Sequence, residues 1–189
     1  NLLPEGLLRT IVCAQHGLRE EDEPGILAAL GDDLPGAVTV SRIGDPVPGP
    51  ADDAMQSSDS TSFSKDSLIR ASIAGNVLKF SMKSRDQRLT LPGSGEYGDR
   101  IVKLPPPGEY DALVHNEFYV MSLAKACDIE VPDFDVVHRE NVEIAPSDWV
   151  TTEEHAFSIA RFDRSDQGRV HMEDFCQAGN LPGFQRSKY

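Results

Sequence analysis

The sequence predicts an α+β fold in which an antiparallel sheet and one helix follow the end of a small α/β unit. Short apolar runs bounded by turn residues recur between residues 69 and 104 and between 134 and 164, at the length typical of strands. Residues 111–127 carry apolar positions at helical spacing, and the first 40 residues carry a separate helical pattern. The 189 residues are enough for one domain or one and a half.

The first 40 residues are predicted to be helical, with a short strand at their end. Apolar residues at helical spacing form a stripe, and Pro4, a residue that favours the first turn of a helix, lies near its start. The stripe consists of Leu2, Leu3, Leu7, Leu8 and Ile11. Residues 26–30 predict a second helix that Gly31 ends, and residues 36–40 predict a strand. Because so short a piece buries little apolar surface by itself, we expect it to pack on another part of the protein.

Residues 46–64 are predicted to be a flexible linker between a first unit, residues 1–45, and a second unit, residues 65–189. The stretch opens with Pro46, Pro48 and Pro50 and continues with a serine-rich run that has hardly any apolar residues. This composition is typical of a solvated hinge, part of which can be disordered.

The second unit is predicted to open with strands at 69–73, 77–82 and 88–91, with a turn at Gly75, and to continue with a strand at 100–104. Residues 93–98 read Gly-Ser-Gly-Glu-Tyr-Gly, formally the G-x-G-x-x-G of dinucleotide-binding proteins. A strand rather than a helix follows this stretch, and it lies only five residues before Lys103. We therefore interpret it as a surface hairpin turn.

The strand at 100–104 places Lys103 inside an apolar run, where an ammonium is costly unless it meets an anion. In the helix that follows, four residues at i, i+3, i+4, i+7 spacing are predicted to form one buried face: Val120, Leu123, Ala124 and Cys127. Glu117 lies three residues earlier on that face. A strand lysine and an inward helix glutamate are the pair with which kinases hold ATP phosphates. The alternative is that Lys103 reaches solvent along its stem and Glu117 is an ordinary carboxylate near the helix end.

The last part of the chain is predicted to form a hairpin of two strands, one beginning at Phe134 and one at 156–164. The second strand runs out into a charged exit at its end. Residues 173–178 predict one or two helical turns.

Residues 72–79, Ser-Ile-Ala-Gly-Asn-Val-Leu-Lys, have the composition of an anion-binding turn. Small residues expose backbone N–H groups, and Lys79 adds a positive charge. Most Ala-Gly turns bind nothing, however, and the plain interpretation of Ser72 is a solvated turn hydroxyl.

Composition excludes several classes of protein. The net charge of −13 has the wrong sign for binding nucleic-acid phosphate. No apolar run approaches 18 residues, so no membrane span is expected. The three cysteines are widely spaced without a CxxC, which favours reduced core thiols and a cytoplasmic location over a disulfide frame or a metal site. The chain begins with Asn1 rather than methionine, which suggests a fragment of a longer protein.

Nine short segments resemble, in this order, the HipA family, the serine/threonine kinase toxins of bacterial toxin–antitoxin pairs. They are Asn1-Leu-Leu-Pro-Glu5, Ser72-Ile-Ala-Gly75 with Lys79, Ile101-Val-Lys-Leu-Pro105, Asn116-Glu117, Leu123-Ala124, Val131-Pro132, Arg161-Phe-Asp-Arg164, Glu173-Asp174 and Lys188-Tyr189. The resemblance covers almost the whole chain except the linker. It implies that the first unit is the end of the family's N-terminal subdomain and that the second is the N-terminal, ATP-binding lobe of the kinase core.

Carried over position by position, the resemblance implies a site for ATP. It makes 74–79 the phosphate loop, Lys103 the phosphate-binding lysine and 160–162 the segment beside the adenine. The implied ATP-binding residues are Ala74, Gly75, Asn76, Val77, Leu78, Lys79, Lys103, Ala160, Arg161 and Phe162. From its place on the helix we infer that Glu117 orients Lys103. Ser72 matches the family's regulatory autophosphorylation site, where a dianionic phosphate would compete with ATP phosphate or repel it.

Two positions depart from the family pattern. The family usually carries a glutamine two positions after Ala-Gly, where this chain has Val77 between Asn76 and Leu78. The adenine segment commonly reads Glu-Arg-Phe, and here Ala160 replaces the glutamate. A backbone contact to adenine would survive that change, whereas a carboxylate contact would not.

The family's catalytic loop, with its aspartate base and His-x-Lys-Asn run, and its magnesium-binding aspartate have no match in these 189 residues. Asp163 and Asp174 do not replace them, because neither has an asparagine and a lysine at the required spacing. We therefore expect no catalytic residue and no metal ligand in this chain, Mg²⁺ ligands outside it, and no phosphoryl transfer by the chain alone.

The resemblance implies that the whole protein transfers the γ-phosphate of ATP to a serine or threonine of a protein, such as an aminoacyl-tRNA synthetase. It also implies a HipB-like helix-turn-helix antitoxin as a partner, through which alone the protein would contact DNA. The alternative, of a different class, is a non-catalytic partner-binding module: a degenerate remnant or the regulatory half of a split kinase system.

Overall fold

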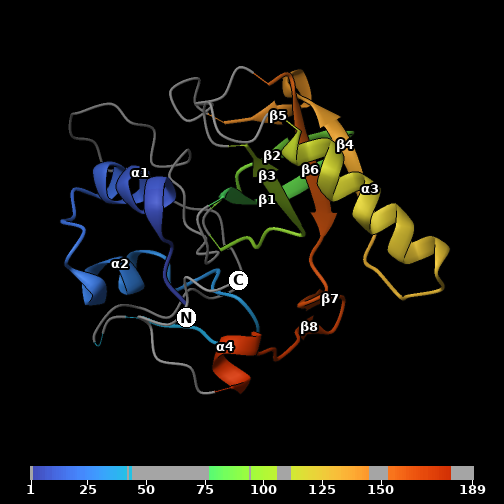
Figure 1. The fold of residues 1–189 in the computed structure, drawn as a ribbon. Helices are drawn as coiled ribbons and strands as arrows, with labels where there is room; N and C mark the ends of the chain where they lie inside the picture. Colours follow the sequence, from blue (N-terminus) through green and yellow to red (C-terminus); the bar gives the residue numbers. More distant parts are fainter. Residues whose placement is uncertain are drawn as a thin grey trace.

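The computed structural model describes residues 2–41, 43, 77–93, 95–105, 112–144 and 153–179, and its central feature is a six-stranded sheet (Figure 1). The strand order is β4-β6-β3-β1-β2-β5, and every pairing is antiparallel except that of β2 with β5. The strands are β1 Leu78–Arg85, β2 Arg88–Thr90, β3 Arg100–Leu104, β4 Phe134–His138, β5 Val142–Glu143 and β6 His155–Ala160. A separate hairpin consists of β7 Arg164–Ser165 and β8 Gly168–Arg169.

The predicted α+β class and most of the predicted strands are confirmed. The strands expected near 77–82, 88–91 and 100–104 are β1, β2 and β3, and the hairpin expected from Phe134 and 156–164 is the antiparallel pair β4 and β6. The strand expected at 69–73 and the turn at Gly75 lie outside the described residues.

Side chains on β1 and β3 alternate between two faces of the sheet. Leu78, Phe80, Val102 and Leu104 are buried and belong to the hydrophobic core. Lys79 pairs with Lys103, and Ser81 pairs with Ile101, on the opposite face. We call this second face the site face, because the predicted lysines lie on it.

The N-terminal part of the chain forms two helices, α1 Gly6–His16 and α2 Glu23–Ala29, as predicted. Gly17 ends α1 in the left-handed region, with φ of 65°, and Asp22 caps α2 by accepting a hydrogen bond from the Gly25 N–H at 3.0 Å. Apolar residues of both helices, such as Leu8 and Ile26, share one core with the sheet. The expectation that this piece packs on another part of the protein is confirmed.

The strand predicted at 36–40 is wrong. Residues 36 and 37 form a turn, and residues 38–40 have no regular structure. Gly36 has φ of 70°, which a strand does not allow, and its carbonyl oxygen accepts a hydrogen bond from Arg164 at 3.0 Å. Arginines from the distant end of the chain therefore occupy carbonyl groups that a neighbouring strand would have needed.

The helix predicted at 111–127 is α3 Leu113–Ala126, but the buried face predicted on it is wrong. Val120 is 56% exposed, Leu123 is 64% exposed, and Cys127 is also exposed. The residue that α3 buries is Val114. Figure 1 shows why: only the first half of α3 lies against β4 and β6, and its second half extends past the edge of the sheet.

The loop at 93–98, the helix at 173–178 and the cysteines were also predicted. The loop at 93–98 joins β2 to β3, which flank β1 on opposite sides, so it is not the turn of a hairpin. Residues 173–178 contain one short helix, α4 Phe175–Ala178, which Asp174 caps, and a 3₁₀ turn, η2 Arg139–Asn141, joins β4 to β5. Cys13 is a buried free thiol as expected, whereas Cys127 is an exposed one.

Within the part of the chain that the structure describes, no helix has both the length and the apolar character needed to cross a membrane.

Candidate functional site

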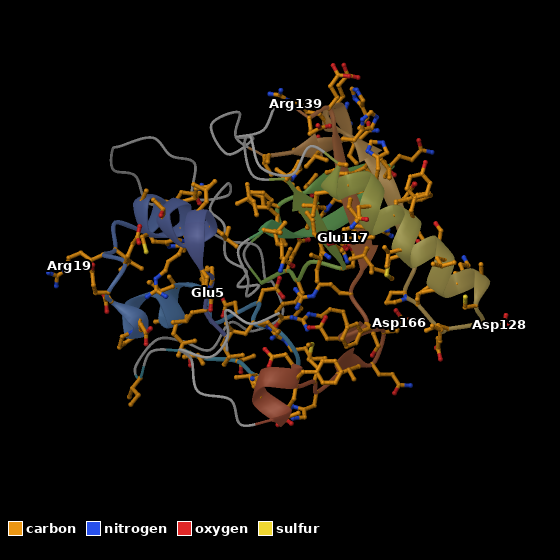
Figure 2. The ribbon with its side chains drawn as sticks, viewed as in Figure 1. Glu5, Arg19, Glu117, Asp128, Arg139 and Asp166 are labelled. Carbon is orange, nitrogen blue, oxygen red and sulfur yellow. The ribbon has the colours of Figure 1, made fainter. Side chains whose placement is uncertain are left out.

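Lys103 and Glu117 form an ion pair on the site face. The Lys103 Nζ lies 2.8 Å from both carboxylate oxygens of Glu117. Both side chains are largely shielded from water, at 21% and 26% exposed. Figure 2 shows Glu117 on the side of α3 toward the sheet, with Asp128 past the far end of the helix. The sheet lysine and the helix glutamate are thus in contact, although the apolar face used to place Glu117 was wrong.

Aromatic side chains surround this pair. The Nζ of Lys103 lies 5.5 Å from the centroid of the Phe157 ring, and Phe157 pairs with Lys103 across β6 and β3. Phe134 stacks on Phe157, and Phe118 of α3 meets Phe134 edge to face. The rings fix α3 against the sheet and give the ammonium an additional cation–π contact.

Lys79 adds a second positive charge directly opposite Lys103. Burial lowers the pKa of Lys79, and the charge of Lys103 lowers it further, while Glu117 and Glu5 act in the other direction. Burial and the charge of Lys103 thus outweigh the two carboxylates at Lys79 and disfavour its charged form. An anionic ligand next to Lys79 and Lys103 would offset the repulsion between their charges.

A cavity of about 370 Å³ opens on the face of β3 that carries Lys103. Ile101, two residues before Lys103 and on the same face of β3, lines it together with Phe162. The N-terminal part of the chain contributes Leu2, Pro35 and Val38 to its walls. Lys103 itself is not part of the lining. The surface of the cavity is mostly apolar, although Asp163, Glu173 and Asp174 also line it. A flat apolar group suits such a space.

A buried ion network lies at one end of the site face and joins distant parts of the chain. It consists of Asp33, Ser81, Arg161, Asp163 and Arg164, and we call it the Asp33 network. Asp33 Oδ1 accepts from Arg161 Nη1 at 2.9 Å and from Arg164 Nη2 at 2.6 Å. Asp33 Oδ2 accepts from the Ser81 hydroxyl at 2.5 Å. Gly98 passes close by, and a Cβ at that position would lie 2.0 Å from the Ser81 Oγ.

Asp163 completes the network. Its Oδ2 accepts from the Gly36 N–H at 2.8 Å and from Arg164 Nη1 at 2.8 Å, and Arg161 donates to both of its carboxylate oxygens. Burial alone would raise the pKa of Asp163, but the hydrogen bonds and charge of Arg161 outweigh burial and hold the pKa below its usual value. Burial likewise opposes the charge of Arg161, but Asp163 and Asp33 raise its pKa. Arg161 and Asp163 thus stabilise each other in their charged forms.

The structure places the predicted site residues in three groups. Ser72, Ala74, Gly75 and Asn76 lie outside the described residues. Lys79, Lys103 and Glu117 lie together on the site face, with Val77 just before β1. Ala160 and Phe162 flank Arg161 at the end of β6, where Phe162 is 64% exposed and lines the cavity.

The side chains of two predicted ATP-binding residues are buried, one in the core and one in the Asp33 network. The side chain of Leu78 is in the core, so that only its backbone remains available to a ligand on the site face. The side chain of Arg161 is in the Asp33 network, so the charges at the exit of the second strand are buried and paired. The N–H of Arg161 donates to the Asp99 carbonyl at 2.9 Å.

Several residues that build this region were not predicted. Asp33 stands beside Asp32 in a short polar stretch, and nothing in the sequence distinguishes the buried carboxylate from the exposed one. Ile101 could have been found, since it precedes Lys103 by two residues and must share its strand face. Among the residues that the structure describes, no group of three or more His, Cys, Asp or Glu side chains is placed to hold a metal ion.

A mostly antiparallel sheet that carries a lysine paired with a helix glutamate defines a kinase-type fold. The model of the HipA N-terminal domain matches residues 1–41, and that of the HipA-like C-terminal domain matches residues 71–189. The second match alone covers more than half of the chain. The chain belongs to the HipA family.

Relatives and a solved structure agree with this assignment. A protein named "Putative kinase Y4dM" from Sinorhizobium fredii is 38% identical over 193 residues, which cover 100% of this chain and 46% of the relative. A second from the same organism, "Putative kinase Y4mE", is 28% identical over 96% of this chain and 45% of its own length. This chain thus spans less than half the length of these relatives.

The solved structure is that of a toxin–antitoxin complex of HipA, HipB and operator DNA from Shewanella oneidensis MR-1. It matches with a TM-score of 0.62 and 25% identity over 94% of this chain and 42% of the matched chain.

Proposed function

We propose that the chain is the N-terminal, ATP-binding part of a HipA-like protein serine/threonine kinase. The observation that carries this proposal is the contact of Lys103 Nζ with both Glu117 oxygens, next to a second lysine on the same face. A lysine held in this way presents its charge at a fixed place, which is what the phosphates of a bound nucleotide require.

In this proposal Lys103 binds the ATP phosphates and Glu117 orients Lys103. Residues 74–79 form the loop that covers the phosphates, with Lys79 at its end. The adenine lies in the cavity between Ile101 and Phe162 and receives backbone contacts from residues 160–162. The apolar lining and the volume of about 370 Å³ support this placement, since a purine needs flat apolar walls and few polar contacts.

Phosphoryl transfer needs groups that this chain is not proposed to supply. The catalytic aspartate and the ligands of Mg²⁺ are proposed to lie outside these residues. ATP bound here would therefore react only when those groups are present. The chain alone is therefore proposed to bind nucleotide without transferring phosphate. Ser72 is proposed as a regulatory phosphorylation site, because a phosphate next to residues 74–79 would compete with those of ATP.

The whole protein is proposed to act on a serine or threonine of another protein, such as an aminoacyl-tRNA synthetase, and to be neutralised by a HipB-like antitoxin. The solved HipA structure contains HipB and operator DNA, which supports a partner of that kind. The net charge of −13 suits a division of labour in which the partner makes the contact with DNA. Residues 1–45 are proposed as the end of the N-terminal subdomain, with 46–64 as the linker.

The test is calorimetric titration of ATP and Mg²⁺ into the chain and into Lys103→Ala. Removing a charge-assisted contact to phosphate should cost about 1.5–3 kcal/mol, which is a loss of about 10- to 150-fold in affinity. Lys125→Ala is the matched control, because it removes an exposed lysine from the last turn of α3. We expect its affinity to equal that of the unchanged chain.

An equal loss in both variants would show that general charge, rather than Lys103, attracts the nucleotide. Absence of binding from a chain shown by circular dichroism to be folded would contradict the proposal. It would favour the second candidate, a non-catalytic partner-binding module, for which the exposed apolar residues Val120 and Leu123 on α3 offer a contact surface.

A further inference from the structure

The Asp33 network connects the N-terminal part of the chain to the wall of the cavity. Asp33 lies after α2, yet its carboxylate accepts hydrogen bonds from four residues of the sheet part of the protein: Ser81, Gly98, Arg161 and Arg164. In return, Asp163 accepts from the Gly36 N–H, and Arg164 donates to the Leu34 carbonyl at 2.8 Å. Residues 33–36 and 161–164 therefore each donate hydrogen bonds to the other segment and accept hydrogen bonds from it.

Both segments contribute residues to the lining of the cavity. Phe162 stands between Arg161 and Asp163, whose side chains are both fixed in the buried network, so the Phe162 side chain is left to face outward into the cavity. Pro35 and Val38 lie within and just after the segment that Asp33 and Gly36 anchor. Ser81 is opposite Ile101 in the register of β1 and β3, so a third wall touches the same network.

We propose that Asp33 is a positioning residue for the base-binding end of the nucleotide site. By holding residues 33–36 against residues 161–164, it fixes the separation of the cavity walls, so that the N-terminal part of the chain sets the affinity for the adenine end. This inference rests on the proposed function. It assigns no contact between Asp33 and the nucleotide, because the carboxylate is buried behind the wall.

The phosphate end of the site depends on other contacts. Lys79 and Lys103 lie on β1 and β3, and Lys103 is held by Glu117 of α3. The two ends of the nucleotide should therefore respond separately to substitutions in the two places.

The experiment measures the binding of three probes, ATP, adenosine and inorganic tripolyphosphate, to the full chain by calorimetry. Asp33→Asn keeps an oxygen for the arginines but removes the charge, and should weaken adenosine and ATP by about tenfold while leaving tripolyphosphate unchanged. Lys103→Ala should show the reverse pattern, with ATP and tripolyphosphate weakened and adenosine unchanged. Asp32→Asn, an equal change at the exposed neighbouring position, is the matched control and should alter none of the three.

Ser81→Ala provides a second, milder variant in case Asp33→Asn does not fold, and should weaken adenosine by about threefold. A loss of all three probes in equal measure would mean that Asp33 only supports the fold, which overturns the inference. Unchanged adenosine binding in both variants overturns it as well. If the unchanged chain binds neither adenosine nor ATP, the proposed function itself is contradicted. This outcome can be told apart from a failure of the inference about Asp33, because it is seen in the unchanged chain before any variant is compared.

Discussion

The charge of Lys79 is disfavoured at its place on the site face. Lys79 and Lys103 lie directly opposite each other on β1 and β3, and Glu117 is in contact with Lys103. Like charges in this position destabilise a sheet, and burial adds to the cost at Lys79, as its lowered pKa shows. An anion bound next to these two lysines would offset part of this cost.

We predict that Lys79→Met makes the ligand-free protein more stable at pH 7, by about 0.2–1 kcal/mol, because burial and the charge of Lys103 together outweigh the acidic neighbours and disfavour the ammonium. The pKa of Lys79 is lower in the folded than in the unfolded chain, so between these two pKa values the unfolded chain binds more protons. The free energy of unfolding of the unchanged protein therefore rises with pH in that window, below the ordinary value of 10.5, and approaches that of the variant.

Urea unfolding of both proteins at several pH values between 7 and 10 measures this convergence. Lys125→Met, at an exposed position on α3, is the control and should show no such trend. A difference between Lys79→Met and the unchanged protein that stays constant up to pH 10 would contradict the prediction.

At the same scale, sequence reasoning was most successful where the interacting residues were close in the chain. Lys103 and Glu117 are 14 residues apart, and their contact was expected from the cost of a buried ammonium. Arg161 and Asp33 are 128 residues apart. Charges at the end of a strand usually reach solvent, and a single sequence does not show which distant carboxylate will bury them.

Among the elements, α3 shows most clearly the limit of helical periodicity. The spacing of Val120 and Leu123 describes an apolar stripe correctly, but not what covers it. The sheet supports only the part of α3 around Val114, and the second half of the helix extends beyond β4 and β6. The strand predicted at 36–40 was wrong for a related reason, since its backbone groups are bound by arginine side chains rather than by a strand.

We predict opposite outcomes for two truncations on α3. Val114→Ala removes buried methyl groups and should lower the free energy of unfolding by about 1–3 kcal/mol. Leu123→Ala removes more carbon atoms but from an exposed position, and should change it by less than about 0.5 kcal/mol. Urea unfolding monitored by circular dichroism compares them, each variant serving as the control of the other. A larger effect at Leu123 would mean that the stripe is buried after all.

In the whole molecule, the Asp33 network makes two parts of the chain into one structure. The helices α1 and α2 share a core with the sheet, and the network adds ionic contacts that neither part could satisfy alone. Removing one partner from a buried ion pair leaves an uncompensated charge. This destabilises a protein far more than replacing both partners with apolar residues.

We predict that Asp163→Asn destabilises the protein by about 3–5 kcal/mol at pH 7, because it leaves Arg161 and Arg164 with too little negative charge. The pKa of Asp163 is depressed in the folded state, so the stabilisation is fully present above its unfolded value of about 3.8 and is lost as the pH falls through the lower, folded value. The difference between the two proteins should therefore be constant from pH 7 to 5 and shrink below pH 4.

Urea unfolding at pH 7, 5 and 3 measures this difference. Asp166→Asn, on an exposed turn three residues away, is the control and should have almost no effect. A loss for Asp163→Asn below 1 kcal/mol at pH 7 would show that the buried charges contribute little to stability.

The separation of Asp33 from its partners also has a consequence for synthesis. Arg164 follows Asp33 by 131 residues. Ribosomes add roughly 5–20 residues per second, so about 7–26 s pass between the synthesis of Asp33 and that of Arg164. Until then the carboxylate has no buried cation to meet and stays hydrated, which keeps residues 33–36 from taking their final place. Residues 33–36, although made early within this sequence, are thus among its last to be completed.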